Sequence, residues 1–164
     1  MPTTIRPLDP DSPGARRLIA LSDALLAALY PPESNHLETR EALRLPNVLF
    51  VGAWLDDELV GCGAVKTLVD RDGAYGELKR VFVPEERRRR GHARAIMAHL
   101  EQHLRGAGVA CARLETGISQ PEALALYRAV GFRERGPFGA YRHDPHSVFM
   151  EKSLAPAGMP AHRG

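Results

Sequence analysis

The chain has 164 residues, of which 44% are hydrophobic and 26% charged, a composition typical of one globular domain and unlike that of a disordered or collagen-like chain. Its 22 basic and 20 acidic residues leave a net charge of +2, which gives no overall attraction to nucleic acid or to an acidic membrane. The sequence contains no apolar run of about 18 residues and no signal-peptide pattern, so we expect a cytoplasmic protein.

The first part of the chain predicts one strand and two helices. A short strand is expected over Thr3–Leu8, and leucines at helical spacing predict a helix over Ala15–Tyr30. The proline pair at 31–32 ends that helix. Ser34 can cap a second short helix that runs to Leu45.

Three β-rich runs then predict an antiparallel meander. They span Val48–Leu55, Leu59–Val69 and Tyr75–Val83, and short turns join them. Gly61 and Gly63, inside the second strand, indicate a bulge or the close approach of another element.

After Pro84 helices and strands alternate. The expected elements are a helix over Gly91–Arg105, a strand over Val109–Glu115, a helix over Pro121–Val130, and strands over Phe132–Arg135 and Ser147–Leu154. Strand–helix–strand order implies local parallel pairing, whereas the meander implies antiparallel pairing.

The expected fold is therefore α/β (α+β), with a single mixed, mostly antiparallel twisted sheet of about seven strands and helices on both faces. This domain covers residues 1–154, and residues 155–164 are expected to form a disordered tail. Sheets of this kind bind ligands at the seam where the pairing changes direction. Cys62 and Cys111 each lie in an apolar run and are expected to be buried thiols. Since no Cys/His cluster has metal-site spacing, we expect no metal.

The most informative stretch is Val81–Ala93, which reads as strand, basic loop, glycine and helix start. A helix start presents unpaired backbone N–H groups and the positive end of the helix dipole, and successive loop amides form an anion cradle. Arg87–Arg90 add charge-assisted hydrogen bonds, and Gly91 lets a diphosphate approach the backbone closely. The stretch predicts a phosphate or pyrophosphate site, with a solvated basic turn or a nucleic-acid patch as the alternative for the arginine run alone.

Two motifs in this order resemble those of the GNAT acetyltransferases, which use acetyl-CoA. Arg88–Ala93 (RRRGHA) resembles the family signature Q/R-x-x-G-x-G/A, and Ala123–Phe132 (ALALYRAVGF) resembles its A-x-x-L-Y-x-x-x-G-F. The resemblance covers about Thr3–Leu154. The segment from Phe138 to Phe149 further resembles the bacterial YsnE-like branch.

The resemblance implies acetyl-CoA as the cosubstrate. The main chain of the central strand would hydrogen-bond the pantetheine arm, and the loop and helix start would bind the pyrophosphate. The implied cofactor-binding residues are Val81, Phe82, Val83, Arg88, Arg89, Arg90, Gly91, His92, Ala93, Arg94, Gln120, Ala123 and Tyr127. Gln120 stands where the family often has Asn, and His92 where an aliphatic or aromatic residue is usual.

Glu77 is the first candidate for the general base. An alkyl amine is mostly protonated at neutral pH, so a group must remove its proton before it attacks the thioester. Several family members place a catalytic Glu at this point of the central strand, and strand alternation predicts that Glu77, Lys79, Val81 and Val83 share one face.

Other assignments of the base stay open. In the alternative interpretation Glu77 only pairs with Lys79 or Arg80, and His143, Asp144 or a water relay takes the proton.

Tyr127 is the candidate general acid. A phenol beside the sulfur can supply a proton to the departing CoA thiolate. The alternative is a core tyrosine, because Leu124 and Tyr127 also suit a buried stripe of the helix over Pro121–Val130.

The acceptor must be bound by other segments. The two long polar loops, Tyr30–His36 and Gly136–His146, carry residue types that function often uses. The candidate substrate-binding residues are Tyr30, Asn35, His36, Lys79, Arg80, Tyr141 and His143. Lys79, Arg80, Arg142 and His143 are also suited to bind an acceptor carboxylate.

The leading interpretation is an enzyme that transfers an acetyl group from acetyl-CoA to a primary amine of a small molecule, through a tetrahedral intermediate. An amino acid or a related metabolite is one candidate acceptor. A non-catalytic acyl-CoA-binding protein is the alternative, and a nucleic-acid-binding module using Arg87–Arg90 is less favoured because no aromatic residues interleave that run. We expect no nucleic-acid or membrane partner and leave a homodimer open.

Overall fold

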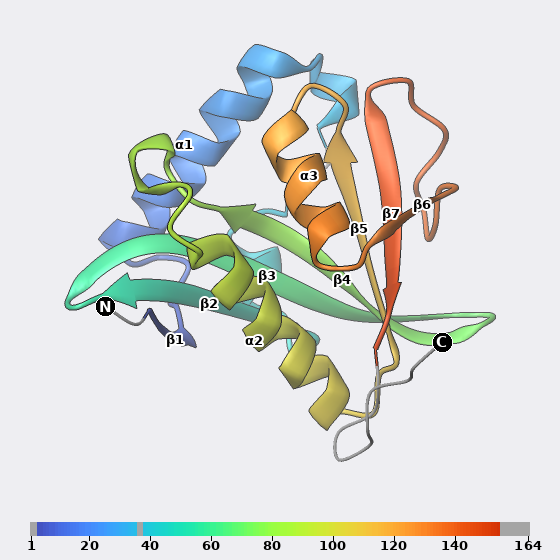
Figure 1. The fold of residues 1–164 in the computed structure, drawn as a ribbon, viewed down its shortest axis with the longest axis horizontal. Helices are drawn as coiled ribbons and strands as arrows, with labels where there is room; N and C mark the ends of the chain where they lie inside the picture. Colours follow the sequence, from blue (N-terminus) through green and yellow to red (C-terminus); the bar gives the residue numbers. More distant parts are fainter. Residues whose placement is uncertain (1–2, 36–37, 155–164) are drawn as a thin grey trace.

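The computed structural model describes residues 3–35 and 38–154, which form one seven-stranded sheet flanked by helices (Figure 1). The strand order is β1-β2-β3-β4-β5-β7-β6, and every neighbouring pair is antiparallel except β4 and β5. The strands are β1 (Thr4–Pro7), β2 (Val48–Leu55), β3 (Glu58–Asp70), β4 (Gly73–Phe82), β5 (Cys111–Gly117), β6 (Arg133–Arg135) and β7 (Ser147–Ser153). The mixed, mostly antiparallel sheet is confirmed, and the expected tail lies outside the described residues.

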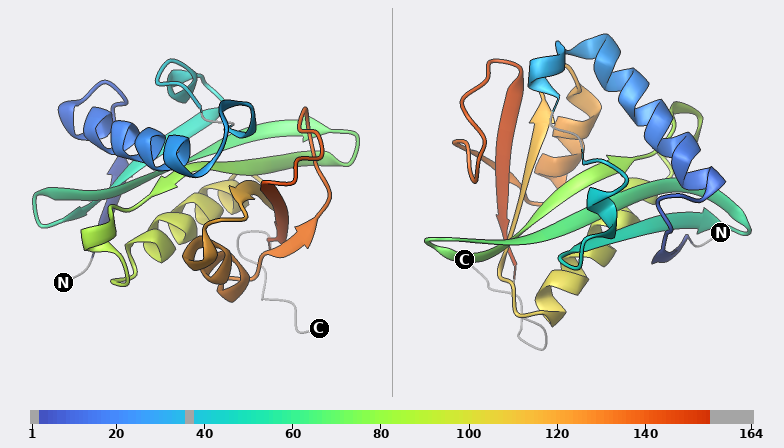
Figure 2. Two further views of the ribbon diagram at one scale, coloured as in Figure 1. Left: turned by 90° about the horizontal axis from the view of Figure 1, so that it is seen from above. Right: turned by 180° about the vertical axis from the view of Figure 1, so that it is seen from behind.

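Three α-helices cover the two faces of the sheet: α1 (Pro13–Leu29) lies on one face, and α2 (His92–Gly106) and α3 (Pro121–Ala129) lie on the other (Figure 2). Ser12 caps α1 by accepting a hydrogen bond from the Ala15 amide at 3.3 Å. Pro13 and Pro121 each stand at the start of a helix, where the missing N–H costs nothing.

The expected second helix, from Ser34 to Leu45, is wrong. The described part of that segment contains two single 3-10 turns, Pro32–Ser34 and Ala42–Arg44. The Ser34 hydroxyl donates to the distant Asp144 carboxylate at 2.7 Å, so it does not cap a helix. A local pattern of capping residue and apolar spacing is overridden here by a tertiary contact.

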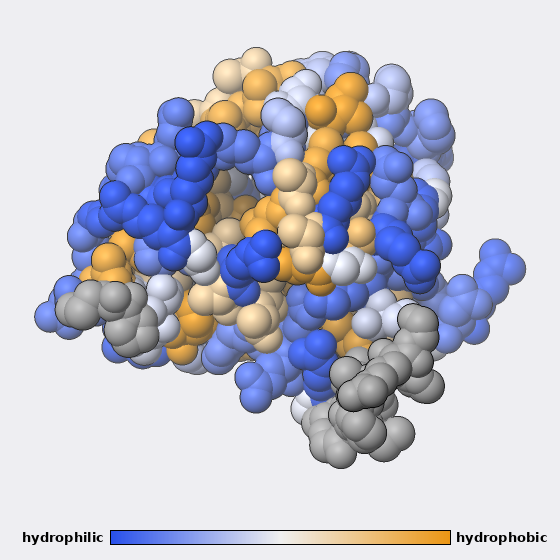
Figure 3. Space-filling view, viewed as in Figure 1, coloured by the Kyte–Doolittle hydropathy of each residue, from blue (hydrophilic) through white to orange (hydrophobic). Residues whose placement is uncertain are grey.

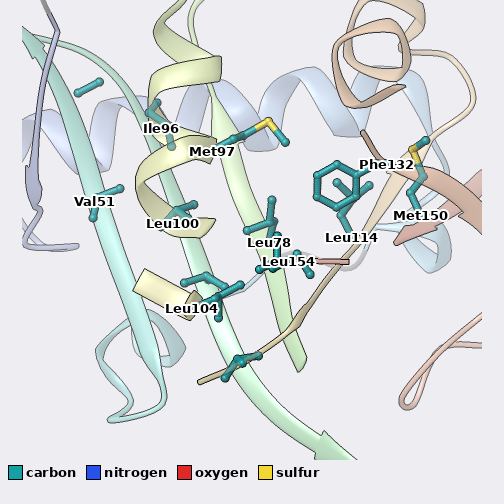
Figure 4. Packing of buried hydrophobic residues seen from close by; sticks show 14 of the residues in the cluster. Val51, Leu78, Ile96, Met97, Leu100, Leu104, Leu114, Phe132, Met150 and Leu154 are labelled. Atoms are coloured by element: carbon teal, nitrogen blue, oxygen red, sulfur yellow. The ribbon is translucent and has the colours of Figure 1, made fainter. Parts of the chain in front are cut away.

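The main core lies between the sheet and α2 (Figure 4). The apolar stripe of α2 predicted from the sequence is buried there, with Ile96, Leu100 and Leu104 fully inside. Gly63 of β3 allows the helix this close, because a Cβ at that position would lie 2.5 Å from Ile96 Cγ2. The expectation of a close approach at the β3 glycines is confirmed.

A β-bulge interrupts β4. Two of its residues, Arg80 and Val81, lie opposite the single residue Gly63 of β3, and Arg80 has a left-handed φ of 55°. The extra residue reverses the alternation of side chains beyond it.

The prediction that Glu77, Lys79, Val81 and Val83 share one face is therefore wrong. Glu77 and Lys79 point to the side of α1 and the segment that follows it, where Lys79 lies 3.2 Å from Glu38. Val81 and Val83 pack with the α2 core on the opposite side. Simple alternation fails because it does not count the inserted residue.

In the parts of the chain that the structure describes, none of the helices has the length and apolar character needed to span a bilayer. The same residues contain no group of three or more His, Cys, Asp or Glu side chains able to hold a metal ion. Cys62 and Cys111 are free thiols. Burial raises the pKa of Cys62 to about 12 and that of Cys111 to about 11, so both stay protonated and unreactive at neutral pH.

Candidate active site

The parallel pair β4–β5 diverges along its length and opens a cleft. The two strands pair over only three positions, from Gly76 opposite Ala112 to Leu78 opposite Leu114. Beyond them both strands continue without pairing to each other, and the cleft there holds about 860 Å³ of empty space, its open mouth included. The expected seam between parallel and antiparallel pairing therefore coincides with a cleft.

The cleft draws its lining from segments far apart in the sequence. Its walls come from the end of α1, the turn after it, β4, β5, the start of α3 and the loop before β7. The lining residues used below are Tyr30, Ser34, Asn35, Glu38, Glu77, Lys79, Arg80, Val81, Phe82, Glu115, Gly117, Gln120, Tyr127, Tyr141 and His146. On the face of the sheet that carries α2 and α3, Figure 3 shows the surface hollowed between the hydrophilic loop before α2 and the edge of α3.

The loop before α2 presents a row of unused main-chain N–H groups. Arg89 and Gly91 adopt left-handed φ values of 66° and 83°, and the first backbone bond of α2 runs from the Ala95 amide to the Gly91 carbonyl at 3.0 Å. Within the described chain, the amides from Arg89 to Arg94 have no acceptor. Consecutive free amides at a helix start form an anion-binding concavity, so this segment fits the pyrophosphate of CoA.

Three arginines of the loop bind other groups of the protein. Arg87 forms an ion pair with Glu58, and the Arg88 Nε donates to the Val83 carbonyl at 2.8 Å. Arg89 pairs with Glu122 at 2.9 Å, which ties the loop to the first turn of α3. The starts of α2 and α3, with the implied cofactor residue Ala123 in the latter, are thus close together. Arg90 and Arg94 are exposed.

His92 does not point to the proposed pyrophosphate site with its side chain. The ring is buried and its Nδ1 lies 2.9 Å from the Thr3 hydroxyl, while Nε2 has no partner among the described residues. Burial, with Arg90 and Arg87 adding to it, lowers the pKa of His92. Of His92, therefore, only the backbone amide is available to the implied cofactor.

Glu77 is buried in the lining and is held by two donors. Its Oε2 accepts from the Tyr141 hydroxyl and lies 3.3 Å from Lys79 Nζ. Lys79 Nζ also donates to the Tyr141 oxygen at 2.9 Å and lies 3.2 Å from Glu38. Burial and the nearby Glu77 charge raise the pKa of Tyr141, which keeps its phenol protonated. Glu77 therefore pairs with Lys79, as one interpretation of the sequence predicts, and it also lines the cleft, as the role of a base requires.

Tyr127 lies across the cleft, on α3. Its ring packs edge-on against Phe132, with ring centres 6.1 Å apart. Burial and the Glu115 charge raise its pKa to about 12. Among the described residues its hydroxyl has no hydrogen-bond partner. The phenol is thus part of the lining and also touches the core.

Gln120 is already engaged by Tyr30. The Tyr30 hydroxyl donates to Gln120 Oε1 at 3.3 Å and accepts from the Ser119 amide at 3.1 Å. A Cβ on Gly117 would lie 1.8 Å from the same hydroxyl, so only glycine fits beneath it. Tyr30 joins the end of α1 to the far wall of the cleft.

The other predicted acceptor residues divide into two groups. Asn35 lines the cleft, and so does Arg80, but the Arg80 guanidinium is bound to Asp23 at 2.6 Å. His143 lies outside the cleft, in a shallow depression beside β6 and the loop after it. His36 lies outside the described residues.

The structure adds a cluster that the sequence prediction missed. The Ser34 hydroxyl donates to Asp144 at 2.7 Å, and His146 Nδ1 lies 3.3 Å from both Ser34 Oγ and Asp144 Oδ1. The sequence predicts Asp144 only as an alternative base, and it predicts His143, not His146, as the histidine of the acceptor site. The Asp-Pro-His order of residues 144–146 was the available signal, since it brings two titratable groups to one turn.

Comparison with known proteins agrees with this geometry. The model of the acetyltransferase (GNAT) family matches residues 16–132. A protein named IAA acetyltransferase from Azospirillum brasilense is 44% identical over 138 residues, which are 84% of this chain and 89% of that protein. The uncharacterized N-acetyltransferase YsnE of Bacillus subtilis is 39% identical over 131 residues, 79% of this chain and 85% of that protein.

A solved structure confirms the fold independently. A crystal structure described as an acyl-CoA N-acyltransferase from Klebsiella pneumoniae is 34% identical to this chain and superposes on it with a TM-score of 0.75, covering 93% of this chain and 98% of the other. Together with the family match and the two relatives, it confirms the resemblance read from the two motifs. The chain belongs to the GNAT acetyltransferase family and is an acyltransferase.

Proposed function

We propose that the protein transfers the acetyl group of acetyl-CoA directly to a primary amine of a small molecule, through a tetrahedral intermediate. The observation that carries the proposal is the cleft at the divergence of β4 and β5, which has Glu77 in one wall and Tyr127 in the other. A thioester between these two side chains would have a proton acceptor on one side and a phenol on the other.

The donor is held mainly by main chain in this proposal. The free amides of Arg89–Arg94 bind the pyrophosphate. The edge of β4 beyond Leu78 has no strand partner on the side of β5, so the main chain of Val81–Val83 is open to the pantetheine arm. Gln120 and Ala123 contribute from the α3 side. The bound donor supplies the acetyl thioester and a thiolate leaving group.

Glu77 acts as the base, directly or through water. An alkylammonium group must lose a proton before its nitrogen can attack the thioester carbon. The Tyr141 hydroxyl and Lys79 hold the Glu77 carboxylate in place. Attack forms the C–N bond, and collapse of the intermediate breaks the C–S bond.

Tyr127 acts as the proton donor to sulfur. With a pKa of about 12 its phenol is protonated at neutral pH, but it is a weaker acid than a thiol, whose pKa is ordinarily about 8.5. Proton transfer to the thiolate is therefore favourable only if the phenol regains a proton in the same step. The remaining ammonium proton of the tetrahedral intermediate supplies it, so Tyr127 relays a proton from nitrogen to sulfur.

The test is acetyl transfer by the intact chain. Free CoA thiol is measured during incubation of the protein with acetyl-CoA and a panel of primary amines, and the products are identified by mass spectrometry. IAA, from the name of the Azospirillum relative, is assayed separately as a candidate acceptor that is not a primary amine. We expect thiol release in equal amount to an acetylated amine. Tight CoA binding with no thiol release for any acceptor would contradict the proposal.

A further inference from the structure

The two buried cations on the acceptor side of the cleft already pair with oxygens of the protein itself. Lys79 Nζ contacts three oxygens, those of Tyr141 at 2.9 Å, Glu38 at 3.2 Å and Glu77 at 3.3 Å. Two of these contacts, with Tyr141 and Glu77, are hydrogen bonds, and the charge of Lys79 is shared between two carboxylates of the protein. The Lys79 side chain is only 10% exposed, and water does not compete strongly for these bonds.

Arg80 is in a similar position. Its Nη1 pairs with Asp23 at 2.6 Å, and its Nε and Nη2 donate to the Glu38 carbonyl at 3.0 and 2.9 Å. Every nitrogen of the guanidinium therefore already donates, and the side chain is 4% exposed. The charge of Arg80 is neutralised by Asp23 from outside the cleft.

The third basic group of the described lining is His146, and it faces Asp144. Its Nδ1 lies 3.3 Å from the Asp144 carboxylate. This ring thus faces a carboxylate that belongs to the protein. Among the described residues, no other basic side chain lines the cleft.

Carboxylates, in contrast, stand along three parts of the lining. Glu38 follows α1, Glu77 lies on β4, and Glu115 lies on β5 and accepts from the Ser147 hydroxyl. An acceptor that brought its own carboxylate into this space would lose solvation and meet like charges without gaining a free cation. An ammonium group would meet oxygens that stabilise it.

We infer that the acceptor is a primary amine that carries no carboxylate near its nitrogen, the class to which decarboxylated amino acids belong. The inference rests on the proposed function and narrows its substrate. It replaces the role expected for Lys79 and Arg80 from the sequence, which was to bind an acceptor carboxylate. In the structure both side chains organise the protein's own oxygens instead.

Matched pairs of amines test the inference, since each pair differs only by the carboxylate. Tyramine is compared with tyrosine, 2-phenylethylamine with phenylalanine, and agmatine with arginine, by thiol release from acetyl-CoA. We expect kcat/KM to favour the carboxylate-free member of the preferred pair by at least about 100-fold, because like-charge juxtaposition costs several kcal/mol. Equal or better use of the amino acid would overturn the inference.

A variant at Glu38 tests the cause assigned to this preference, which is the negative charge of the lining. Glu38→Ala removes one negative charge and one of the two carboxylates that pair with Lys79, while the main-chain bonds to Arg80 stay. The preference against the carboxylate should then narrow by roughly tenfold, or about 1.4 kcal/mol. Glu41→Ala is the matched control, since Glu41 is exposed and lies outside the cleft, and it should keep the wild-type preference. Both variants are checked for unchanged melting temperature.

The outcomes separate the inference from the function beneath it. An unchanged preference in a folded Glu38→Ala protein would contradict the assigned cause. Acetylation of amino acids at rates equal to the amines would overturn the acceptor class and leave the proposed function intact. Absence of thiol release with every amine of every pair would overturn the proposed function and this inference with it.

Discussion

In the proposed function, the donor and the acceptor are held by different parts of the polypeptide. The pyrophosphate of the donor is held by a contiguous stretch of main chain, the amides of Arg89–Arg94, shaped by two left-handed residues. The acceptor side is a set of side chains from α1, β4, β5 and the loop before β7. Substitutions that change only a side chain should therefore leave donor binding largely intact and alter chemistry or acceptor choice, whereas a change in backbone conformation should do the opposite.

The largest expected effect is on the acceptor side. Glu77→Gln keeps the shape of the side chain and removes the base, so turnover should fall on the order of 10²–10⁴-fold, while CoA affinity stays near that of the wild type. The measurement is kcat against pH together with calorimetry of CoA binding. A Glu77→Gln protein with a wild-type pH–rate profile would transfer the role of base to another group, and His146 is then the first to examine.

Tyr127→Phe comes next, because it removes one hydroxyl and leaves the ring. Turnover should fall by roughly 10²-fold if the phenol relays the proton. The melting temperature should move little, since no hydrogen-bond partner among the described residues is left unpaired. Thermal unfolding and single-turnover acetyl transfer on the same preparation decide the matter. A destabilised but fully active protein would exclude the relay.

Gly91→Val tests the donor side and should have a smaller effect. No atom lies within 4 Å of a Cβ at Gly91, but its φ of 83° is strained for a branched residue. The loop should shift, and CoA affinity should fall at least about tenfold, or 1.4 kcal/mol.

Gly108→Val is the matched control for this backbone effect. Gly108 has a φ of 76° and equally open surroundings, but it lies outside the loop. It should lose stability without losing CoA affinity by calorimetry. Equal loss of CoA affinity in both variants would show that general destabilisation, and not the loop, controls binding.

The smallest expected effect concerns His92. Its pKa is lowered below the ordinary value of 6.5, mainly by burial, so the unfolded chain binds a proton more readily than the folded protein. The free energy of unfolding should therefore keep its full value above pH 6.5 and decrease as the pH falls below 6.5. His92→Asn keeps a polar group for Thr3 and should reduce this decline by about 1 kcal/mol or less, measured by urea unfolding at pH 7.5 and 5.5. Equal slopes in the two proteins would contradict the assignment.

The same difference between the two sides explains what the sequence could predict. The loop, glycine and helix start before α2 lie within a few residues of one another, so their pattern is visible locally. The role of Ser34 is not visible locally because its partner Asp144 is 110 residues away. His143 and His146 lie close together in the sequence, which does not tell which of the two side chains lines the cleft.

The bulge in β4 is a second feature that the sequence alone does not predict. The glycines of β3 indicated an irregularity, but the inserted residue lies on the neighbouring strand, at Arg80. Beyond the bulge the side chains still alternate between the two faces of the sheet, but each faces the side opposite to the one that simple alternation predicts. The sequence around Val81 and Val83 is therefore compatible with a strand that has the bulge and with one that lacks it. Only the pairing with β3 distinguishes the two arrangements.

The short parallel pairing of β4 with β5 has a mechanical consequence. The sheet consists of two blocks, β1–β4 and β5–β7, joined by three paired positions. Glu77 belongs to the first block and Tyr127, on α3, follows the second (Figure 1). Because Glu77 is itself one of the three paired residues of β4, this short pairing fixes the proposed proton acceptor against β5. The unpaired strand ends beyond it leave the space that lies toward the proposed proton donor, Tyr127.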